Sequence, residues 1–168
     1  MTYGCPVGGT GEFTTRARGP ARRAESWAST PAVRRSMLSN RSRDTKPEIA
    51  VRRLVHAAGL RYRVDFRPLA GLNRRADIVF PGLKIAIFID GCFWHGCPEH
   101  HTVAESNGEY WASKVTRNRA RDRETDHALE SYDWLVLRAW EHEPAEEVAQ
   151  RVIDAVQARR TNAFSRRP

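Results

Sequence analysis

A short segment near the middle of the chain concentrates residue types that bind metal ions and transfer protons. Between Phe88 and His101 the sequence carries two cysteines, three histidines and Asp90, directly after an apolar run. Aspartate, histidine and cysteine are common metal ligands and proton-transfer groups. An apolar strand that ends in such residues presents them on a rigid scaffold. We therefore expect the chemistry of this protein in this segment.

The cysteines and histidines have the spacing of a zinc site. Cys92, Cys97 and His100 supply three ligands within one loop, and His142 supplies a fourth after a separate strand. Two cysteines and two histidines form a closed tetrahedral zinc site, which would pin a long irregular loop. His101 is an alternative to His100. Without a metal ion, the same residues would be buried reduced cysteines beside surface histidines.

Two acidic residues predict a separate site for a hard cation. Asp77 lies on an otherwise apolar strand and Asp90 ends the neighbouring strand, so both carboxylates are expected at one sheet edge. Magnesium takes one or two carboxylates, keeps several waters and uses substrate phosphate oxygens. His95 would then be the general base that activates a water molecule. The alternative for Asp77 is a structural ion pair with Arg74 or Arg75.

The charge balance and the aromatic residues indicate a polyanionic partner. The 168 residues include 28 Lys and Arg against 20 Asp and Glu, a formal net charge of +8, which favours nucleic acid. Lys114, Arg117 and Arg121 form one basic helix face that would meet phosphates, although such faces are more often merely solvated. Phe93 and Trp94 would stack on bases or wedge between them; the alternative is core filling.

The periodicity of apolar residues predicts the elements that position these side chains. Helices are expected at about 31–38, 47–58, 109–131 and 145–159, and strands at 61–66, 76–80, 83–89 and 134–140. A capping box, Thr45-x-x-Glu48, begins the second helix, and the strands at 76–80 and 83–89 form a hairpin in the middle of the sheet. The order predicts an α/β fold, a single mixed sheet flanked by helices.

Composition divides the chain into one folded domain and two flanking segments. The domain is expected at 26–160, between a disordered basic N-terminal arm at 1–25 and a basic C-terminal tail at 161–168. No apolar run has the length of a membrane span, and the first residues lack the apolar core of a signal peptide. With three cysteines and no disulfide framework, a cytoplasmic, nucleoid-associated protein is expected.

From about Ser26 to Val156 the sequence resembles the very short patch repair (Vsr) DNA mismatch endonucleases, relatives of the restriction endonucleases. The most specific motif is Asp90-Gly91-Cys92-Phe93-Trp94-His95. Further matches are Arg35-Ser36-Met37, Thr45-x-x-Glu48, Ala76-Asp77, Glu109-Tyr110-Trp111 with Lys114, Arg121-Asp122 and Trp140-Glu141. Agreement at all of these positions by chance is implausible.

The resemblance implies a restriction-endonuclease-like domain that nicks duplex DNA 5′ to the thymine of a T:G mismatch by Mg²⁺-dependent hydrolysis. It implies that Asp77 and the main-chain carbonyl of Ile89 ligate Mg²⁺, and that His95 activates the attacking water. Glu48 and Asp90 would support this centre. A related nuclease with another specificity, or a zinc-stabilised DNA-binding module that does not cut, is the alternative.

The resemblance also assigns the wedge and the zinc site. Met37, Phe93 and Trp94 would insert into the duplex beside the mismatch, and structural zinc would be held by Cys92, Cys97, His100 and His142. Some members have histidine at the position of Asp90, so metal ligand, outer-shell partner and orienter of the base all stay open for this residue. Family likeness suggests a monomer without a membrane partner. It leaves open whether mismatch-repair proteins or a cytosine-5 methyltransferase system cooperate with it.

Overall fold

The structure is a computed structural model that describes residues 43–102 and 107–165. The helix expected at 31–38, the arm at 1–25 and Met37 lie outside this range. Among the described residues, no helix is long and apolar enough to span a membrane.

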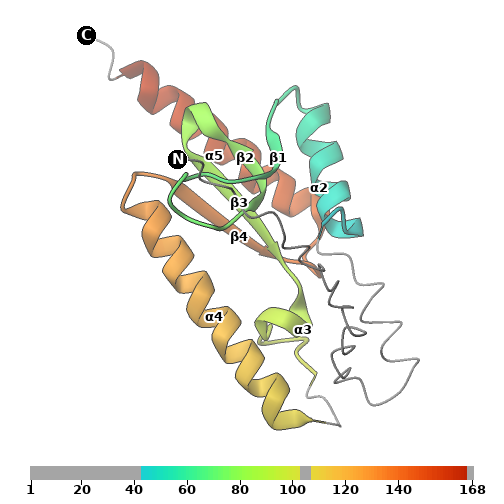
Figure 1. The fold of residues 1–168 in the computed structure, drawn as a ribbon. Helices are drawn as coiled ribbons and strands as arrows, with labels where there is room; N and C mark the ends of the chain where they lie inside the picture. Colours follow the sequence, from blue (N-terminus) through green and yellow to red (C-terminus); the bar gives the residue numbers. More distant parts are fainter. Residues whose placement is uncertain (1–42, 103–106, 166–168) are drawn as a thin grey trace, which may run out of the picture.

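The elements follow the predicted order along the chain. They are α2 (Lys46–Ala57), β1 (Arg63–Phe66), β2 (Ala76–Phe80), the 3₁₀ helix η1 (Pro81–Leu83), β3 (Ile85–Asp90), α3 (Cys92–His95), α4 (Gly108–Glu130), β4 (Leu135–Trp140) and α5 (Ala145–Ser165) (Figure 1). The predicted helices and strands of this region are confirmed. The short helix α3 is an addition, because the sequence indicated only a loop there.

One mixed sheet carries the residues of interest at a single edge. Its strand order is β1-β2-β3-β4, with antiparallel pairs except for the parallel pair β3 and β4. The hairpin strands β2 and β3 lie in the middle, as predicted. The parallel register pairs Asp90 with Trp140, so β3 and β4 end side by side. Because β2 runs antiparallel to β3, its first residues, Ala76 and Asp77, lie at the same edge.

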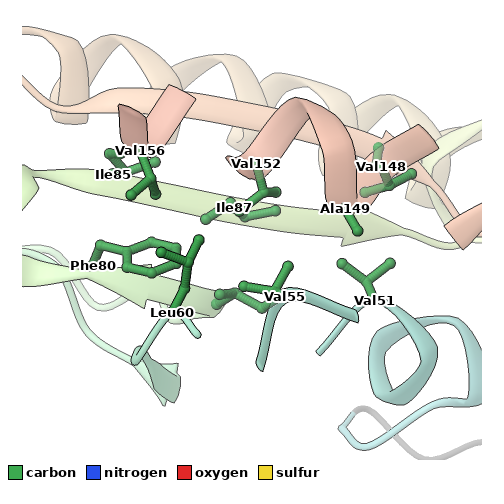
Figure 2. Packing of buried hydrophobic residues seen from close by; sticks show 12 residues of the cluster. Val51, Val55, Leu60, Phe80, Ile85, Ile87, Val148, Ala149, Val152 and Val156 are labelled. Atoms are coloured by element: carbon green, nitrogen blue, oxygen red, sulfur yellow. The ribbon is translucent and has the colours of Figure 1, made fainter. Parts of the chain in front are cut away.

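Helices cover both faces of the sheet. In β3, Ile85 and Ile87 face α2 and α5, and Figure 2 shows them packed against Val152 and Val156 of α5. The alternate residues of β3 belong to a second cluster with Leu129 of α4, on the opposite face. Successive side chains of a strand point to opposite faces, so a strand buried on both sides reads as a continuous apolar run. The sheet is therefore a rigid support for its polar edge.

Two local predictions are wrong in detail. Helix α5 continues to Ser165, well into the predicted tail at 161–168, because no glycine or proline interrupts it after Ala145. The capping box is replaced by another arrangement: the Thr45 hydroxyl donates to Glu48 Oε1 at 2.9 Å, and the main-chain N–H of Asp44 donates to Oε2 at 3.0 Å. The helix still begins at Lys46, as expected. The carboxylate of Glu48 is buried and accepts hydrogen bonds from the donors around it.

Candidate active site and metal centre

A cleft of about 860 Å³ opens at the polar edge of the sheet. It is bordered by the ends of β3 and β4, the start of β2, and residues of α2, α3 and α4. The predicted site residues that line it are Glu48, Asp77, Ile89, Asp90, Trp94, His95 and Arg121. The fold therefore brings together side chains that lie up to 73 positions apart in the sequence.

Asp77 is held by the backbone of the neighbouring strand. Its Oδ2 accepts a hydrogen bond from the Ile89 N–H at 2.7 Å. The ion pairs considered for it are not formed, since Arg74 and Arg75 pair with other carboxylates. The orientation of Asp77 is thus set by the sheet and not by a surface cation.

The environment of Asp77 disfavours its own negative charge. Burial raises the pKa of Asp77 to about 7, and the charges of Glu48 and Asp90 add to this effect, while the hydrogen bond from Ile89 opposes it. A divalent cation bound to the carboxylate would favour the ionised form. A buried carboxylate with two further carboxylates nearby is a suitable donor for a hard cation such as Mg²⁺.

His95 is oriented by carboxylates from two other elements. Its Nδ1 lies 2.6 Å from Asp122 Oδ2 and 3.6 Å from Asp90 Oδ1. Burial of the ring would lower the pKa of His95, but the hydrogen bond to Asp122 and the two negative charges outweigh burial and raise the pKa above its ordinary value. A proton on Nδ1 leaves Nε2 as the basic nitrogen. His95 thus has the environment of a general base supported by a carboxylate.

Glu48 lies in the wall of the cleft and is almost completely buried, at 3% exposure. Its Oε2 accepts a hydrogen bond from Arg52 Nη2 at 2.7 Å, within the same helix. Together with the Thr45 hydroxyl, this bond orients the carboxylate. Glu48 thus borders the site with Arg52, which it shares with Asp44, as its counter-charge.

Four side chains form a group with the geometry of a metal site. The donor atoms of Cys92, Cys97, His100 and His142 lie within 4.8 Å of one another. His142 Nδ1 is 3.1 Å from Cys92 Sγ and 3.7 Å from Cys97 Sγ. Tetrahedral zinc, with bonds of about 2.0–2.3 Å, separates its ligands by about 3.3–3.8 Å. The group fits one such ion, and it contains His100 and not His101.

The short helix α3 connects this group to the cleft. It begins at Cys92 and ends at His95, so one helical turn carries a member of each site. The Cys92 N–H donates to Glu141 Oε1 at 2.7 Å, while the N–H of Glu141 donates to the Asp90 carbonyl at 2.9 Å. Gly96 ends the turn at φ +64°, where a Cβ would lie 2.7 Å from a side-chain atom of α4. The position of α3 is therefore tightly determined.

An aromatic cluster stands beside the cleft. Phe93, Trp94 and Trp111 contact one another edge to face, with ring centroids 5.2–5.6 Å apart. Lys114 Nζ lies 4.9 Å from the Trp94 ring centroid and 5.2 Å from that of Trp111. Phe93 and Trp94 are only half-buried and lie outside both hydrophobic clusters. They pack with Trp111 in a cluster of their own, apart from the two cores of the sheet.

The predicted basic face of α4 adjoins the cleft. Lys114, Arg117 and Arg121 line a hollow of about 370 Å³ together with Tyr110 and Asn118. Asn118 and Arg121 also line the cleft, so the hollow and the cleft share these two residues. Such a surface suits a chain of phosphates that passes from the hollow into the cleft.

Known proteins are similar to this chain in sequence. A family model described as DNA mismatch endonuclease Vsr matches residues 28–102. The Type II nicking enzyme V.NaeI of Lentzea aerocolonigenes is 44% identical over 124 residues, which are 73% of this chain and 75% of that protein. The chain belongs to the Vsr family. The Type II nicking enzyme V.XorIIP of Xanthomonas oryzae pv. oryzae is 40% identical over 116 residues, 67% of this chain and 82% of that protein. The DNA mismatch endonuclease Vsr of Escherichia coli K12 is 34% identical over 111 residues, 64% of this chain and 67% of that protein.

Membership of the Vsr family confirms the resemblance and identifies the chain as a nuclease. Sequence reasoning did not find every residue of this Vsr-family site. It gave no role to Asp122, Arg138 or Glu141, although all three line the cleft. Asp122 and Glu141 stood within matched motifs, which was the available signal. Arg138 stood on an ordinary strand pattern and gave none.

Proposed function

We propose that this protein is a Mg²⁺-dependent DNA endonuclease that nicks one strand of a duplex 5′ to the thymine of a T:G mismatch. The observation that carries the proposal is the shared cleft of Asp77 and His95. One is a buried carboxylate with an unfavourable charge, and the other is an imidazole oriented by a carboxylate. Binding DNA without cutting it would require neither arrangement.

In the proposed reaction, Asp77 and the main-chain carbonyl of Ile89 would hold Mg²⁺. The ion would neutralise charge on the scissile phosphate and on the leaving oxygen. His95 Nε2 takes a proton from the attacking water, and Asp122 holds Nδ1–H and stabilises the imidazolium that forms. Glu48 would support this border of the cleft through its ion pair with Arg52 and its hydrogen bonds from Asp44 and Thr45.

The second metal site would be structural zinc, held by Cys92, Cys97, His100 and His142. It would tie the start of α3 to the segment after β4, beside the bond between Cys92 and Glu141. Because α3 carries His95, the zinc would preserve the geometry of the cleft without taking part in hydrolysis.

The substrate contacts follow from the surfaces that border the cleft. Phe93 and Trp94 would wedge beside the mismatch, as the half-buried aromatic cluster allows. Lys114, Arg117 and Arg121 would contact phosphates of the duplex. Met37, which lies outside the described residues, is proposed as a third wedge residue from the resemblance alone. The protein would act as a monomer.

Nicking with another specificity is the second candidate, because two of the relatives are named Type II nicking enzymes. One assay separates the candidates: a duplex with a single T:G mismatch and its T:A control are incubated with the protein and Mg²⁺. Selective nicking of the mismatched duplex that disappears in Asp77→Ala, with binding retained, supports the proposal. Equal cleavage of both duplexes supports the second candidate. Binding without cleavage contradicts both.

A further inference from the structure

The side chain of Arg138 links three carboxylates at the border of the cleft. Its Nη1 lies 2.7 and 2.9 Å from the two oxygens of Asp90, and its Nε lies 2.9 and 3.1 Å from those of Asp126. Its Nη2 lies 3.5 Å from Asp122 Oδ1. The guanidinium also stacks over the Phe88 ring, 4.6 Å from its centroid. With 23% of its side chain exposed, Arg138 is held on several sides.

These contacts connect three elements, β3, α4 and β4. Asp90 ends β3, while Asp122 and Asp126 lie one turn apart on α4. Arg138 stands on β4 and contacts both elements at once, which the planar fork of a guanidinium allows and a lysine ammonium does not. The same Asp122 holds His95. The position of the imidazole therefore depends on Arg138 through one intermediate side chain.

Asp90 differs from Asp77 in the partner of its carboxylate. Both oxygens of Asp90 face the Arg138 guanidinium, whereas the hydrogen bond of Asp77 comes from the Ile89 N–H. Asp90 thus has its counter-charge within the protein. Without Arg138, the carboxylates of Asp90, Asp122 and Asp126 would repel one another, and Asp122 would lose a contact that orients it.

We propose that Arg138 is a positioning residue for the nicking reaction, and that Asp90 serves as its anchor and not as a ligand of the catalytic metal ion. The inference rests on the proposed function. Asp90 orients the guanidinium, the guanidinium orients Asp122, and Asp122 orients His95. The two residues act as one unit in holding Asp122, so loss of either is expected to displace the imidazole, and Asp90 also lies 3.6 Å from His95 Nδ1 directly.

A double-mutant cycle tests this unit. Arg138→Gln, Asp90→Asn and the double variant are compared in single-turnover nicking of the T:G duplex, with Arg159→Gln as the control because its ion pair with Asp133 lies away from the cleft. Each single variant is expected to lower the single-turnover rate constant by about 100-fold, the cost of a misplaced catalytic group. The protein concentration and the Mg²⁺ concentration for half-maximal rate should stay near the wild-type values. The double variant should be about as active as the slower single variant.

Two further measurements distinguish a positioning role from a general loss of structure. Arg138→Lys, which keeps the charge but contacts fewer carboxylates, should recover part of the rate. Urea unfolding of the same set should show a destabilisation by the double variant that is smaller than the two single effects combined. This second cycle requires no substrate and no metal ion.

Specific results would overturn the inference. If Asp90→Asn raises the half-maximal Mg²⁺ concentration at least tenfold while Arg138→Gln does not, Asp90 is a metal ligand. Independent, multiplicative effects on the single-turnover rate constant would show that the two residues are not one unit. If the wild-type protein nicks neither duplex, the proposed function fails. The unfolding cycle then still decides the coupling, and a coupling of zero refutes it.

Discussion

Replacing Asp77 with asparagine is expected to stabilise the metal-free protein while it abolishes nicking. Asparagine has nearly the same shape and can still accept the hydrogen bond from the Ile89 N–H, but it carries no charge. The aspartate is costly in the folded state because burial, with the charges of Glu48 and Asp90, raises its pKa from 3.8 to about 7. A residue kept at such a cost is expected to serve function and not stability.

The sign of the pH dependence follows from this raised pKa. Below about pH 4 the carboxyl is protonated in both the folded and the unfolded chain, and it makes no difference to stability. Between about pH 4 and pH 7 the unfolded chain ionises while folded Asp77 holds its proton, so stability falls as pH rises. Above about pH 7 the loss is complete and constant.

The magnitude can be bounded from the same values. The rise from 3.8 to about 7 corresponds to about 4 kcal/mol, at about 1.36 kcal/mol for each pH unit. Water in the open cleft screens part of this cost, and the new amide N–H₂ must find a partner, which removes about 1 kcal/mol more. We therefore expect a gain of about 1–3 kcal/mol at pH 8, or an increase in Tm of about 3–10 °C for a chain of this size.

Thermal unfolding at pH 8 and pH 5, with a chelator and with Mg²⁺, measures this effect. Asp154→Asn is the matched control, because Asp154 is an exposed residue of α5. The gain of Asp77→Asn should be larger at pH 8 than at pH 5. Mg²⁺ should stabilise the wild-type protein and not the variant. If the variant is no more stable than the wild-type protein at pH 8, or gains equally at both pH values, the electrostatic reasoning is refuted.

Three further outcomes are expected. His95→Gln should lower the single-turnover rate constant of nicking about 10²–10⁴-fold with little change in duplex affinity, because it removes only the proton acceptor; weakened binding of the same size would contradict this role. Asp122→Asn should shift the acid limb of the pH–rate profile to lower pH, since the negative charge that raises the pKa of His95 is lost; an unmoved limb would exclude His95 as the titrating base. Cys97→Ser should bind no zinc by elemental analysis and lose soluble expression, and a soluble, zinc-free, active variant would contradict a structural zinc.

Much of the fold was predictable from local patterns in the sequence. The helices and strands of the described region follow from apolar periodicity, which depends on residues only a few positions apart. Local spacing likewise predicted the Cys92, Cys97 and His100 group, whose donors meet as expected. The wrong details, at Thr45 and at the end of α5, concern boundaries, where weak local preferences compete with nearby side chains.

The partners of the site residues were decided by tertiary structure. Asp122 lies 27 positions from His95, and Arg138 lies 48 positions from Asp90. No local pattern connects such pairs. They meet because β3 and β4 pair in parallel and end at one edge, and because the apolar packing of Leu129 against the sheet holds α4 across that edge. Residue types thus predicted the chemistry of this chain. The charged partners of each site residue depend on distances that only the packed fold defines.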